Sequence, residues 1–237
     1  MLNEKCEILV HDELAAGYRL LVVKASGMAP QLVPGQFVHV KVPALEKSAL
    51  RRPFSVFNAE DGKVYILYKT VGRGTAALNA AKVGETLEII GPLGHGFPVK
   101  CDGAALLVGG GYGVAPLYFL AKRLVASGWK GRLAVFIGGR TETDLLAVEE
   151  FRSLGVELHQ SADGGGVADG AEEEVVFHHF SVNFHTDMFV ADLGQFGNAA
   201  QNVGRVAQRI LRGLGHRIAG LGKGTEGCHI AEIPVTE

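Results

Sequence analysis

The stretch AALLVGGGYGVAPLYFLAKRL, residues 104–124, decides the fold. It opens with a continuous apolar run that is typical of a buried strand. It then passes through a glycine turn at 109–113 and continues with apolar residues at helical spacing. A glycine turn at the carboxyl end of a parallel strand is where α/β sheets bind nucleotides. We therefore expect a nucleotide-binding βα unit here, with an ordinary tight βα loop as the alternative.

These glycines do not form the G-x-G-x-x-G dinucleotide fingerprint. Counted from Gly109, the third glycine of the pattern is replaced by Val114, and counted from Gly111 it is replaced by Pro116. Pro116 suits the first turn of a helix, because its ring presets the backbone angle and its missing N–H would have no partner there. The turn is therefore compatible with a nucleotide site of a different spacing.

Downstream of this unit, strands and helices alternate. RLAVFIGG (132–139) and VELHQ (156–160) are expected to be buried strands. TDLLAVEEFRSLG between them is expected to be a helix that Thr143 caps and Gly155 ends. Strands that alternate with helices predict a parallel sheet with crossover connections.

Upstream, the first hundred residues have the pattern of short strands. Turn signals separate β-rich runs at 18–25, 36–43, 54–59, 64–71 and 86–90. Several short strands at this spacing predict a small antiparallel barrel. The expected fold class is a two-domain α+β chain: an antiparallel β-barrel over residues 1–100, a Rossmann-like parallel α/β layer over 101–163, and an atypical C-terminal segment over 164–237.

Composition narrows the class of protein. The net charge is −2 and no apolar run is long enough to cross a bilayer, so neither nucleic acid nor a membrane is expected as a partner. The N-terminus lacks the pattern of a signal peptide, which predicts a cytoplasmic protein. Cys6, Cys101 and Cys228 are far apart, so neither a disulfide framework nor a cysteine metal site is expected.

RRPFSVFN, residues 51–58, places two arginines in front of a strand. A guanidinium group donates a bidentate fork that suits phosphate. Pro53 fixes the backbone before the strand, and Ser55 is small enough for a flat ring to approach, with a hydroxyl that can bond a ring heteroatom. Taken alone, the motif is better explained as a turn with two solvated arginines.

A second motif, LYKTVGRGTAALNAAKVGE at 67–85, ends a strand in Gly72-Arg73-Gly74 and begins a helix. We expect Thr75 to cap this helix, which would run through Ala81. Glycines let backbone N–H groups approach an anion, and a helix N-terminus adds a partial positive charge. The motif predicts a phosphate cradle, with a plain strand-to-helix turn as the alternative. A third motif, GPLGHGFPV at 91–99, predicts a rigid turn.

Four motifs now stand in a fixed order: R-P-F-S, L-Y-K with G-x-G-T, G-P-L-G-x-G-F, and G-G-G-x-G-x-A-P. This order resembles the ferredoxin-reductase-like flavoproteins and, within them, the electron-transfer subunits of dihydroorotate dehydrogenase B, over about residues 1–163. The resemblance implies that the barrel binds FAD and the α/β layer binds NAD(H). It also implies a catalytic dihydroorotate dehydrogenase subunit of pyrimidine biosynthesis as the partner that accepts the electrons.

The resemblance further implies roles for single residues. Arg52 would hold the FAD pyrophosphate, and Ser55 would face the isoalloxazine ring, whereas Arg51 is expected to be surface charge. The expected FAD site is completed by Pro53, Phe54, Leu67, Tyr68, Lys69, Gly74 and Thr75, and the expected NAD(H) site comprises Gly109, Gly110, Gly111, Gly113, Ala115 and Pro116. No catalytic side chain is implied, because the flavin carries the chemistry. NADPH stays open, since Arg140 follows the second strand.

The last third departs from the family. Its members carry four closely spaced cysteines for a [2Fe–2S] cluster, whereas this segment has only Cys228 and lacks the C-G-P turn. Ten of the eleven lysines precede residue 164. We expect residues beyond about 165 to pack poorly, because an unrelated segment or a lost reading frame has replaced the family sequence; a relative that works without a cluster is the third explanation. His178, His179 and His185 match no metal-binding spacing.

Two rival functions stay open at this point. One is another NAD(P)H-dependent reductase subunit of the same fold, of the hydrogenase or sulfur-reductase type. The other is a degenerate FAD-binding module without activity. Copurification with a catalytic partner separates the first rival from the leading hypothesis, and NADH oxidation with an artificial acceptor excludes the second.

Overall fold

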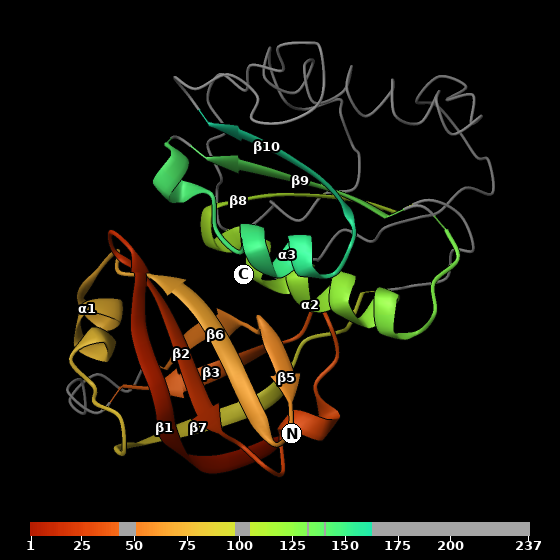
Figure 1. Cartoon of the computed structure of the whole chain (residues 1–237). Helices are drawn as coiled ribbons and strands as arrows, with labels where there is room; N and C mark the ends of the chain where they lie inside the picture. The colour runs from red at the N-terminus through yellow and green to blue at the C-terminus, as the bar shows by residue number, and fades with distance from the viewer. Residues whose placement is uncertain (43–50, 98–104, 132, 140, 163–237) are drawn as a thin grey trace, which may run out of the picture. The chain divides into compact units, whose positions relative to one another are not determined.

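The computed structural model describes residues 1–42, 51–97, 105–131, 133–139 and 141–162. These described residues divide into two compact units: one comprises those within 1–97 together with 114–123, and the other comprises the rest of them. The first unit holds an antiparallel sheet and the second a parallel sheet, so the expected fold class is confirmed (Figure 1). The predicted boundary near Lys100, Arg140, and every prediction for residues 164–237 lie outside the described residues.

The first unit is a half-barrel built from one antiparallel sheet in the strand order β4-β3-β7-β1-β2-β6-β5. The strands are β1 (Leu2–Ala15), β2 (Tyr18–Lys24), β3 (Phe37–Lys41), β4 (Arg52–Ser55), β5 (Asn58–Glu60), β6 (Lys63–Lys69) and β7 (Thr86–Leu93). The predicted run 54–59 is two strands rather than one, because the chain leaves the sheet at Val56 and Phe57 before β5 begins.

Alternate side chains of each strand fill the barrel interior. In β6, Val64, Ile66 and Tyr68 belong to the buried core, and Val38 and Val40 of β3 face them from across the barrel interior. A strand places successive side chains on opposite faces, so every second residue is apolar and buried. Each fully buried Val, Ile or Leu contributes roughly 1.5–3 kcal/mol relative to an exposed one.

The long first strand, β1, was not among the predicted runs. Its segment Leu2–Ile8 alternates inward Cys6 and Ile8 with exposed Lys5 and Glu7. Three charged residues within these seven positions hide this alternation from a search for β-rich composition, although the period of two is present. β1 pairs with both β2 and β7 and so lies in the middle of the sheet.

Helix bounds also differ from the predictions. Helix α1 (Arg73–Asn79) begins after Gly72 in an extended conformation, so Thr75 lies inside the first turn rather than at the cap, and the helix ends before Ala81. Helix α3 (Val148–Ser153) is shorter than predicted, because a 3-10 turn at Glu142–Asp144 precedes it. Gly155, with φ of +69°, follows α3 as the predicted stop.

Helix α2 (Val114–Ala126) contributes its first three turns to the barrel unit. Phe119 enters the barrel core, and the ring of Tyr118 stacks on Phe57 at a centroid distance of 4.6 Å. Lys122 Nζ lies 2.6 Å from Glu60 Oε2. The sheet and the helix thus share one hydrophobic core, and an ion pair at its edge fixes the register between them.

The second unit is a parallel sheet in the order β10-β9-β8. Its strands are β8 (Ala105–Gly110), β9 (Leu133–Gly139) and β10 (Glu157–Ala162). The predicted alternation of strand and helix from residue 105 to 162 is therefore confirmed. No helix among the described residues is long and apolar enough to span a membrane.

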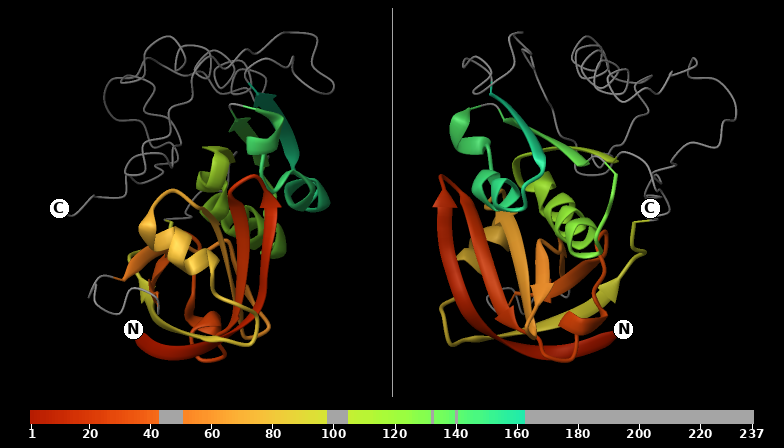
Figure 2. Two further views of the ribbon diagram at one scale, coloured as in Figure 1. Left: turned by 90° about the vertical axis from the view of Figure 1, so that its left-hand side faces the viewer. Right: turned by 45° about the vertical axis from the view of Figure 1, so that its right-hand side comes forward.

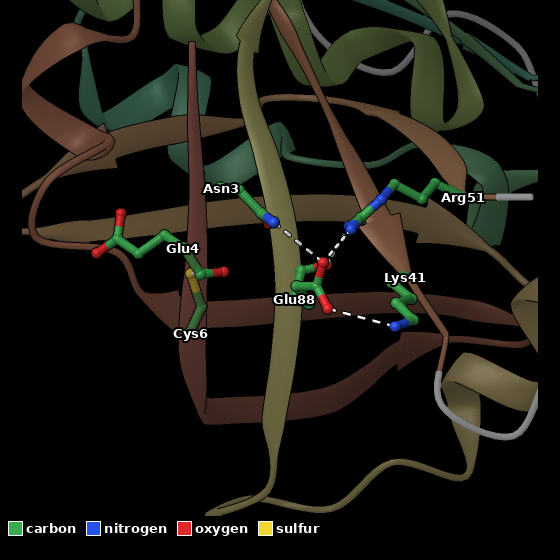
Figure 3. Close-up of polar contacts among 6 residues, drawn as sticks. All are labelled: Asn3, Glu4, Cys6, Lys41, Arg51 and Glu88. Carbon is green, nitrogen blue, oxygen red and sulfur yellow. Dashed lines mark hydrogen bonds and ion pairs between the residues drawn. The ribbon is translucent and has the colours of Figure 1, made fainter. Parts of the chain in front are cut away.

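One carboxylate joins three strands on the outer face of the half-barrel (Figure 3). Glu88 of β7 accepts a hydrogen bond from Asn3 Nδ2 at 3.1 Å, pairs with Lys41 Nζ at 3.3 Å, and forms an ion pair with Arg51. Arg51 also donates to the Glu88 carbonyl oxygen at 2.9 Å. Arg51 is thus a structural residue that holds the start of β4 to β7, and its expected role as surface charge is wrong.

The Glu88 network makes the fold sensitive to acid. The hydrogen bonds from Asn3 and Arg51 lower the pKa of Glu88 from 4.5 to about 2. A lowered folded-state pKa stabilises the fold above pH 4.5, and this contribution is lost as the pH falls from 4.5 toward 2. We expect Glu88→Gln to lose less of its free energy of unfolding between pH 6 and pH 3 than the unsubstituted chain loses, as measured by urea unfolding.

The matched control for this measurement is Glu7→Gln, at an exposed position of β1 on the same outer face. That variant should show the pH dependence of the unsubstituted chain. If Glu88→Gln also shows it unchanged, the ion network is not the origin of the acid sensitivity.

Candidate cofactor site

The half-barrel is open along one line, between β4 and β6. β4 pairs only with β3 among the described strands, and β6 pairs with β5 only from Lys63 to Tyr65. The two strands are nevertheless close to each other: the rings of Phe54 and Tyr68 meet edge to face at 5.6 Å between centroids. We call this line the seam: residues 52–55 on one side and 66–69 on the other. Along the seam, β4 and β6 do not pair with each other through a ladder of backbone hydrogen bonds.

Arg52 and Gly74 form one end of the seam. A Cβ atom added to Gly74 would lie 3.0 Å from Arg52 Cδ and 3.2 Å from Cγ, and closer still to Nε. The guanidinium stem therefore lies against the backbone of the first turn of α1, in space that only a glycine leaves. Both residues are predicted to bind phosphate, and they belong to separate sequence motifs. The fold brings them into contact.

Thr75 shapes the turn that leads into α1. Its Oγ1 accepts hydrogen bonds from Val71 N at 2.9 Å and Gly72 N at 3.1 Å, and donates to Gly72 O at 3.1 Å. This hydroxyl thus holds the glycine turn in shape. Helix α1 lies against the barrel (Figures 1 and 2), and its Leu78 belongs to the buried core. N–H groups of the first helical turn have no acceptor within the helix and are directed toward its N-terminal end.

The predicted ring-contacting residues divide between the two faces of the seam. Phe54 and Tyr68 belong to the core and point inward, so a ligand on the outer face can reach them only through their backbone. Ser55 is exposed. Leu67 and Lys69 alternate with Tyr68 and so point to the other face of the strand, where Leu67 is buried and Lys69 is half-buried. Pro53 is exposed on the same outer face of β4, opposite His39.

Lys69 is held at the edge of the seam by its neighbour on β2. Its Nζ donates to Tyr18 Oη at 2.9 Å and lies 4.2 Å from the centroid of the Tyr18 ring. An ammonium group over an aromatic face is attracted by the ring quadrupole and loses mobility. The chain therefore keeps a positive charge beside the outer face of the seam.

His11 is a residue that the motifs did not indicate. Its side chain is buried beneath the seam, with Nδ1 2.8 Å from Ala81 O and Nε2 2.8 Å from the Tyr68 hydroxyl. Burial lowers the pKa of His11 and raises the pKa of Tyr68 to about 12, so both side chains are neutral near pH 7. A single histidine within a strand has no local sequence signal, because its partners are 57 and 70 residues away.

The glycine motif of the second unit has the expected form. Gly109 and Gly110 end β8, a 3-10 turn follows at Gly111–Gly113, and α2 begins at Val114. Gly111 has φ of +52°, a value that glycine adopts without strain. Ala115 and Pro116 therefore lie in the first turn of α2.

The turn after β9 is compact. Gly139 approaches the backbone so closely that an added Cβ would lie 2.9 Å from Thr141 O and 3.0 Å from Asp144 Cβ. Thr141 Oγ1 donates to Asp144 Oδ2 at 3.1 Å, and Asp144 is buried. This turn lies at the carboxyl edge of the parallel sheet, as does the glycine turn after β8.

Two domain families match this chain. Residues 5–97 match the Oxidoreductase FAD-binding domain, and residues 107–163 match the Oxidoreductase NAD-binding domain. The fold and the matched domains thus define a flavin- and nicotinamide-dependent oxidoreductase module of the ferredoxin reductase-like class.

Curated relatives of the chain identify its family within this class. The chain is 37% identical over 190 residues to the dihydroorotate dehydrogenase B (NAD(+)), electron transfer subunit, of Bacillus cereus (strain Q1), which covers 78% of this chain and 72% of that protein. The corresponding subunit of Bacillus anthracis (strain CDC 684 / NRRL 3495) gives the same figures. The chain belongs to the family of these electron transfer subunits. A match over 78% of 237 residues also extends past residue 163, further than the motifs indicated.

Solved structures support the same fold. The NADH-dependent reduced ferredoxin-NADP oxidoreductase is 31% identical with a TM-score of 0.61, over 70% of this chain and 58% of that one. The ferredoxin-NADP+ reductase from Plasmodium falciparum has 15% identity and a TM-score of 0.59, over 69% of this chain and 71% of that one, and shows the fold alone. This chain thus aligns with little more than half of the first structure.

The described residues fit FAD and do not fit an iron–sulfur cluster. The arginine that lies against Gly74 and the adjoining seam, along which β4 and β6 share no ladder, suit a phosphate group followed by a flat ring. A [2Fe–2S] cluster needs four cysteines, and the chain has three. Of these, Cys6 is buried in the barrel, where burial raises its pKa to about 12, so it is not available as a thiolate ligand.

The contact between Arg52 and Gly74 is directly testable. We expect Gly74→Ala to displace the Arg52 side chain and to weaken FAD binding by about tenfold, the equivalent of one charge-assisted hydrogen bond. Its effect on the free energy of unfolding should be neutral or stabilising by up to about 1 kcal/mol, since alanine favours a helix. Isothermal titration of the apoprotein with FAD and urea unfolding measure the two quantities.

Gly72→Ala is the control in the same turn, because a Cβ atom there meets nothing within 4 Å. It should bind FAD more tightly than Gly74→Ala does. Equal affinities in the two variants would mean that the position of Arg52 does not determine binding.

Proposed function

We propose that this chain is the FAD-dependent electron-transfer subunit that passes electrons from NADH to a catalytic partner, a dihydroorotate dehydrogenase of pyrimidine biosynthesis. The observation that carries the proposal is the contact of Arg52 with Gly74 at the end of the open seam. It brings a guanidinium fork and a helix-initiating turn to the place where a pyrophosphate and an adjoining ring would lie.

The phosphate end is assigned to Arg52 and the turn at 72–75. A guanidinium bonds phosphate oxygens in pairs, and such charge-assisted bonds are about twice as strong as neutral ones. The Thr75 hydroxyl holds Val71 and Gly72, so the turn is shaped before a ligand arrives. Little conformational entropy is then lost on binding, which favours affinity.

The ring end is assigned to the outer face of the seam. Ser55 has an exposed hydroxyl for a ring heteroatom, and the Lys69 ammonium is fixed by Tyr18. Leu67 is buried, so its assigned contact with the ring is through its backbone. FAD, when bound, supplies the redox chemistry by accepting a hydride equivalent and releasing electrons. A positive charge held beside the ring lowers the free energy of the reduced, more negative form, so Lys69 favours reduction.

The nicotinamide nucleotide is assigned to the turns at the carboxyl edge of the parallel sheet. The glycines at 109–113 allow a close backbone approach, and α2 begins directly after them. Open α/β sheets bind ligands at this edge. The assignment of Gly109, Gly110, Gly111, Gly113, Ala115 and Pro116 rests on this position and on the match of residues 107–163.

The acceptor of the electrons is assigned to a separate protein. Curated relatives at 37% identity are named as electron transfer subunits of dihydroorotate dehydrogenase B. The chain lacks the cysteines for a cluster of its own, so a partner must take the electrons that leave the flavin. Coexpression with a catalytic dihydroorotate dehydrogenase subunit should yield a stable complex that reduces NAD+ with dihydroorotate; a complex with a hydrogenase or sulfur-reductase subunit instead would favour the rival assignment.

The visible spectrum of the purified protein tests the cofactor assignments. We expect flavin absorption bands without an iron–sulfur shoulder, and bleaching of these bands when NADH is added without air. Flavin bands that NADH does not bleach would mean a binding module without reductase activity. A colourless protein that takes up no added FAD would contradict the proposal.

The role of Arg52 is tested by Arg52→Ala. Loss of a bidentate charged contact costs roughly 1.5–3 kcal/mol, so FAD should bind about 10- to 100-fold more weakly. Arg152→Ala, at an exposed position of α3, is the control and should keep the affinity of the unsubstituted chain. Full flavin occupancy in Arg52→Ala would refute the assignment of the pyrophosphate to this residue.

A further inference from the structure

A buried chain of hydrogen bonds runs beneath the seam. It begins at Ala81 O just after α1, passes through the ring of His11 on β1, and ends at the Tyr68 hydroxyl on β6. His11 is 8% exposed and Tyr68 is 2% exposed, so water does not compete for these bonds. The motifs do not include His11, and the assigned contacts with FAD do not use either side chain.

The direction of each bond follows from its acceptor. A carbonyl oxygen can only accept, so His11 Nδ1 carries the proton and donates to Ala81 O. In the neutral imidazole Nε2 is then an acceptor, and the Tyr68 O–H donates to it. Consecutive hydrogen bonds of this kind polarise and strengthen one another in a low-dielectric interior.

The groups around His11 favour this neutral form. Arg19 of β2 donates from NH2 to the His11 carbonyl oxygen at 3.0 Å, and its charge opposes a proton on the ring. Asp12, next in the chain, acts in the opposite direction, but burial is the largest effect and lowers the pKa of His11. Tyr68, on the other side of the ring, is neutral for the same reason.

The hydrogen bonds of His11 connect the two elements that border the proposed FAD site, α1 and β6. Ala81 lies two residues beyond α1, whose first turn contains Gly74 at the phosphate end. Tyr68 lies on β6 between Leu67 and Lys69 at the ring end. Its ring also contacts Phe54 of β4, the other side of the seam. One imidazole thus spans the interior between the phosphate end and the ring end.

We propose that the His11–Tyr68 hydrogen bond is a positioning device for FAD: it sets the distance between α1 and β6, and therefore the affinity for the cofactor, without touching it. The proposal rests on the proposed function. The pyrophosphate and the ring are joined by a short covalent linkage, so both ends of the site must have the correct spacing at once. If α1 were displaced, FAD could bind correctly at only one end: either its phosphate or its ring would be out of place.

Three variants test this role. Tyr68→Phe removes the hydroxyl, and His11→Leu removes both hydrogen bonds while it keeps apolar volume. His11→Gln keeps one amide donor for Ala81 O and one carbonyl acceptor for Tyr68. We expect FAD to bind about tenfold more weakly to the first two variants, and His11→Gln to restore the affinity to within about threefold of the unsubstituted chain.

The readouts separate positioning from stability. The dissociation constant for FAD is measured by titration of the apoprotein well below its unfolding transition, and apoprotein stability is measured by urea unfolding. Ile89→Val, a truncation in the core on β7, is the control, because β7 pairs with β1 and β3 and Ile89 takes no part in the hydrogen bonds of His11. It should lower apoprotein stability and leave the dissociation constant unchanged.

Each outcome supports or overturns the positioning role of the His11–Tyr68 hydrogen bond. Weaker FAD binding in Tyr68→Phe and His11→Leu, with recovery in His11→Gln, supports the positioning role. Lower apoprotein stability with an unchanged dissociation constant overturns it and leaves a purely structural bond. An unsubstituted chain that binds no FAD overturns the proposed function and this inference together, whereas tight binding by the unsubstituted chain and all three variants overturns the inference alone.

Discussion

The contact between Arg52 and Gly74 is the constraint on which the rest of the cofactor site depends. It requires a glycine in the first turn of α1, an arginine at the start of β4, and a barrel that brings these two segments together across 22 residues of sequence. The neighbouring Arg51 has a different task. It forms an ion pair with Glu88 and holds the start of β4 to the central strands (Figure 3). Of the two arginines in the RRPFS motif, Arg51 thus stabilises the strand, and Arg52 is the one proposed to bind the anion.

Ion pairs and buried side chains hold the barrel together around the site, whereas β4 and β6, where a ligand is expected, are not paired with each other. Glu88 joins β7 to β1, β3 and the start of β4 on the outer face, and Phe119 with the Lys122–Glu60 ion pair attaches α2. Between β4 and β6, in contrast, the described residues share no ladder. An occupant of this seam would lie along two strand edges that no ladder joins to each other.

Much of this could be predicted from the sequence, and the failures have physical causes. The change from period two to helical spacing near residue 104 predicted the barrel and the parallel sheet, because burial imposes those periods. The motif at 72–75 predicted a phosphate cradle, whereas the role of Arg52 followed only from the resemblance to the flavoprotein family, and both assignments stay predictions. Arg51 and His11 were misjudged or missed, because their partners, Glu88 and Tyr68, are distant in sequence and only the fold brings them together. The inward direction of Phe54 and Tyr68 likewise depends on strand register, which the motif does not encode.

The most direct test of this account is a crystal structure of the chain with FAD bound. The account predicts that the guanidinium of Arg52 lies about 2.7–2.9 Å from oxygens of the FAD pyrophosphate, beside Gly74, with the isoalloxazine ring on the outer face of the seam near Ser55 and Lys69. A pyrophosphate bound away from Arg52, or a ring that lies outside the seam, would contradict it.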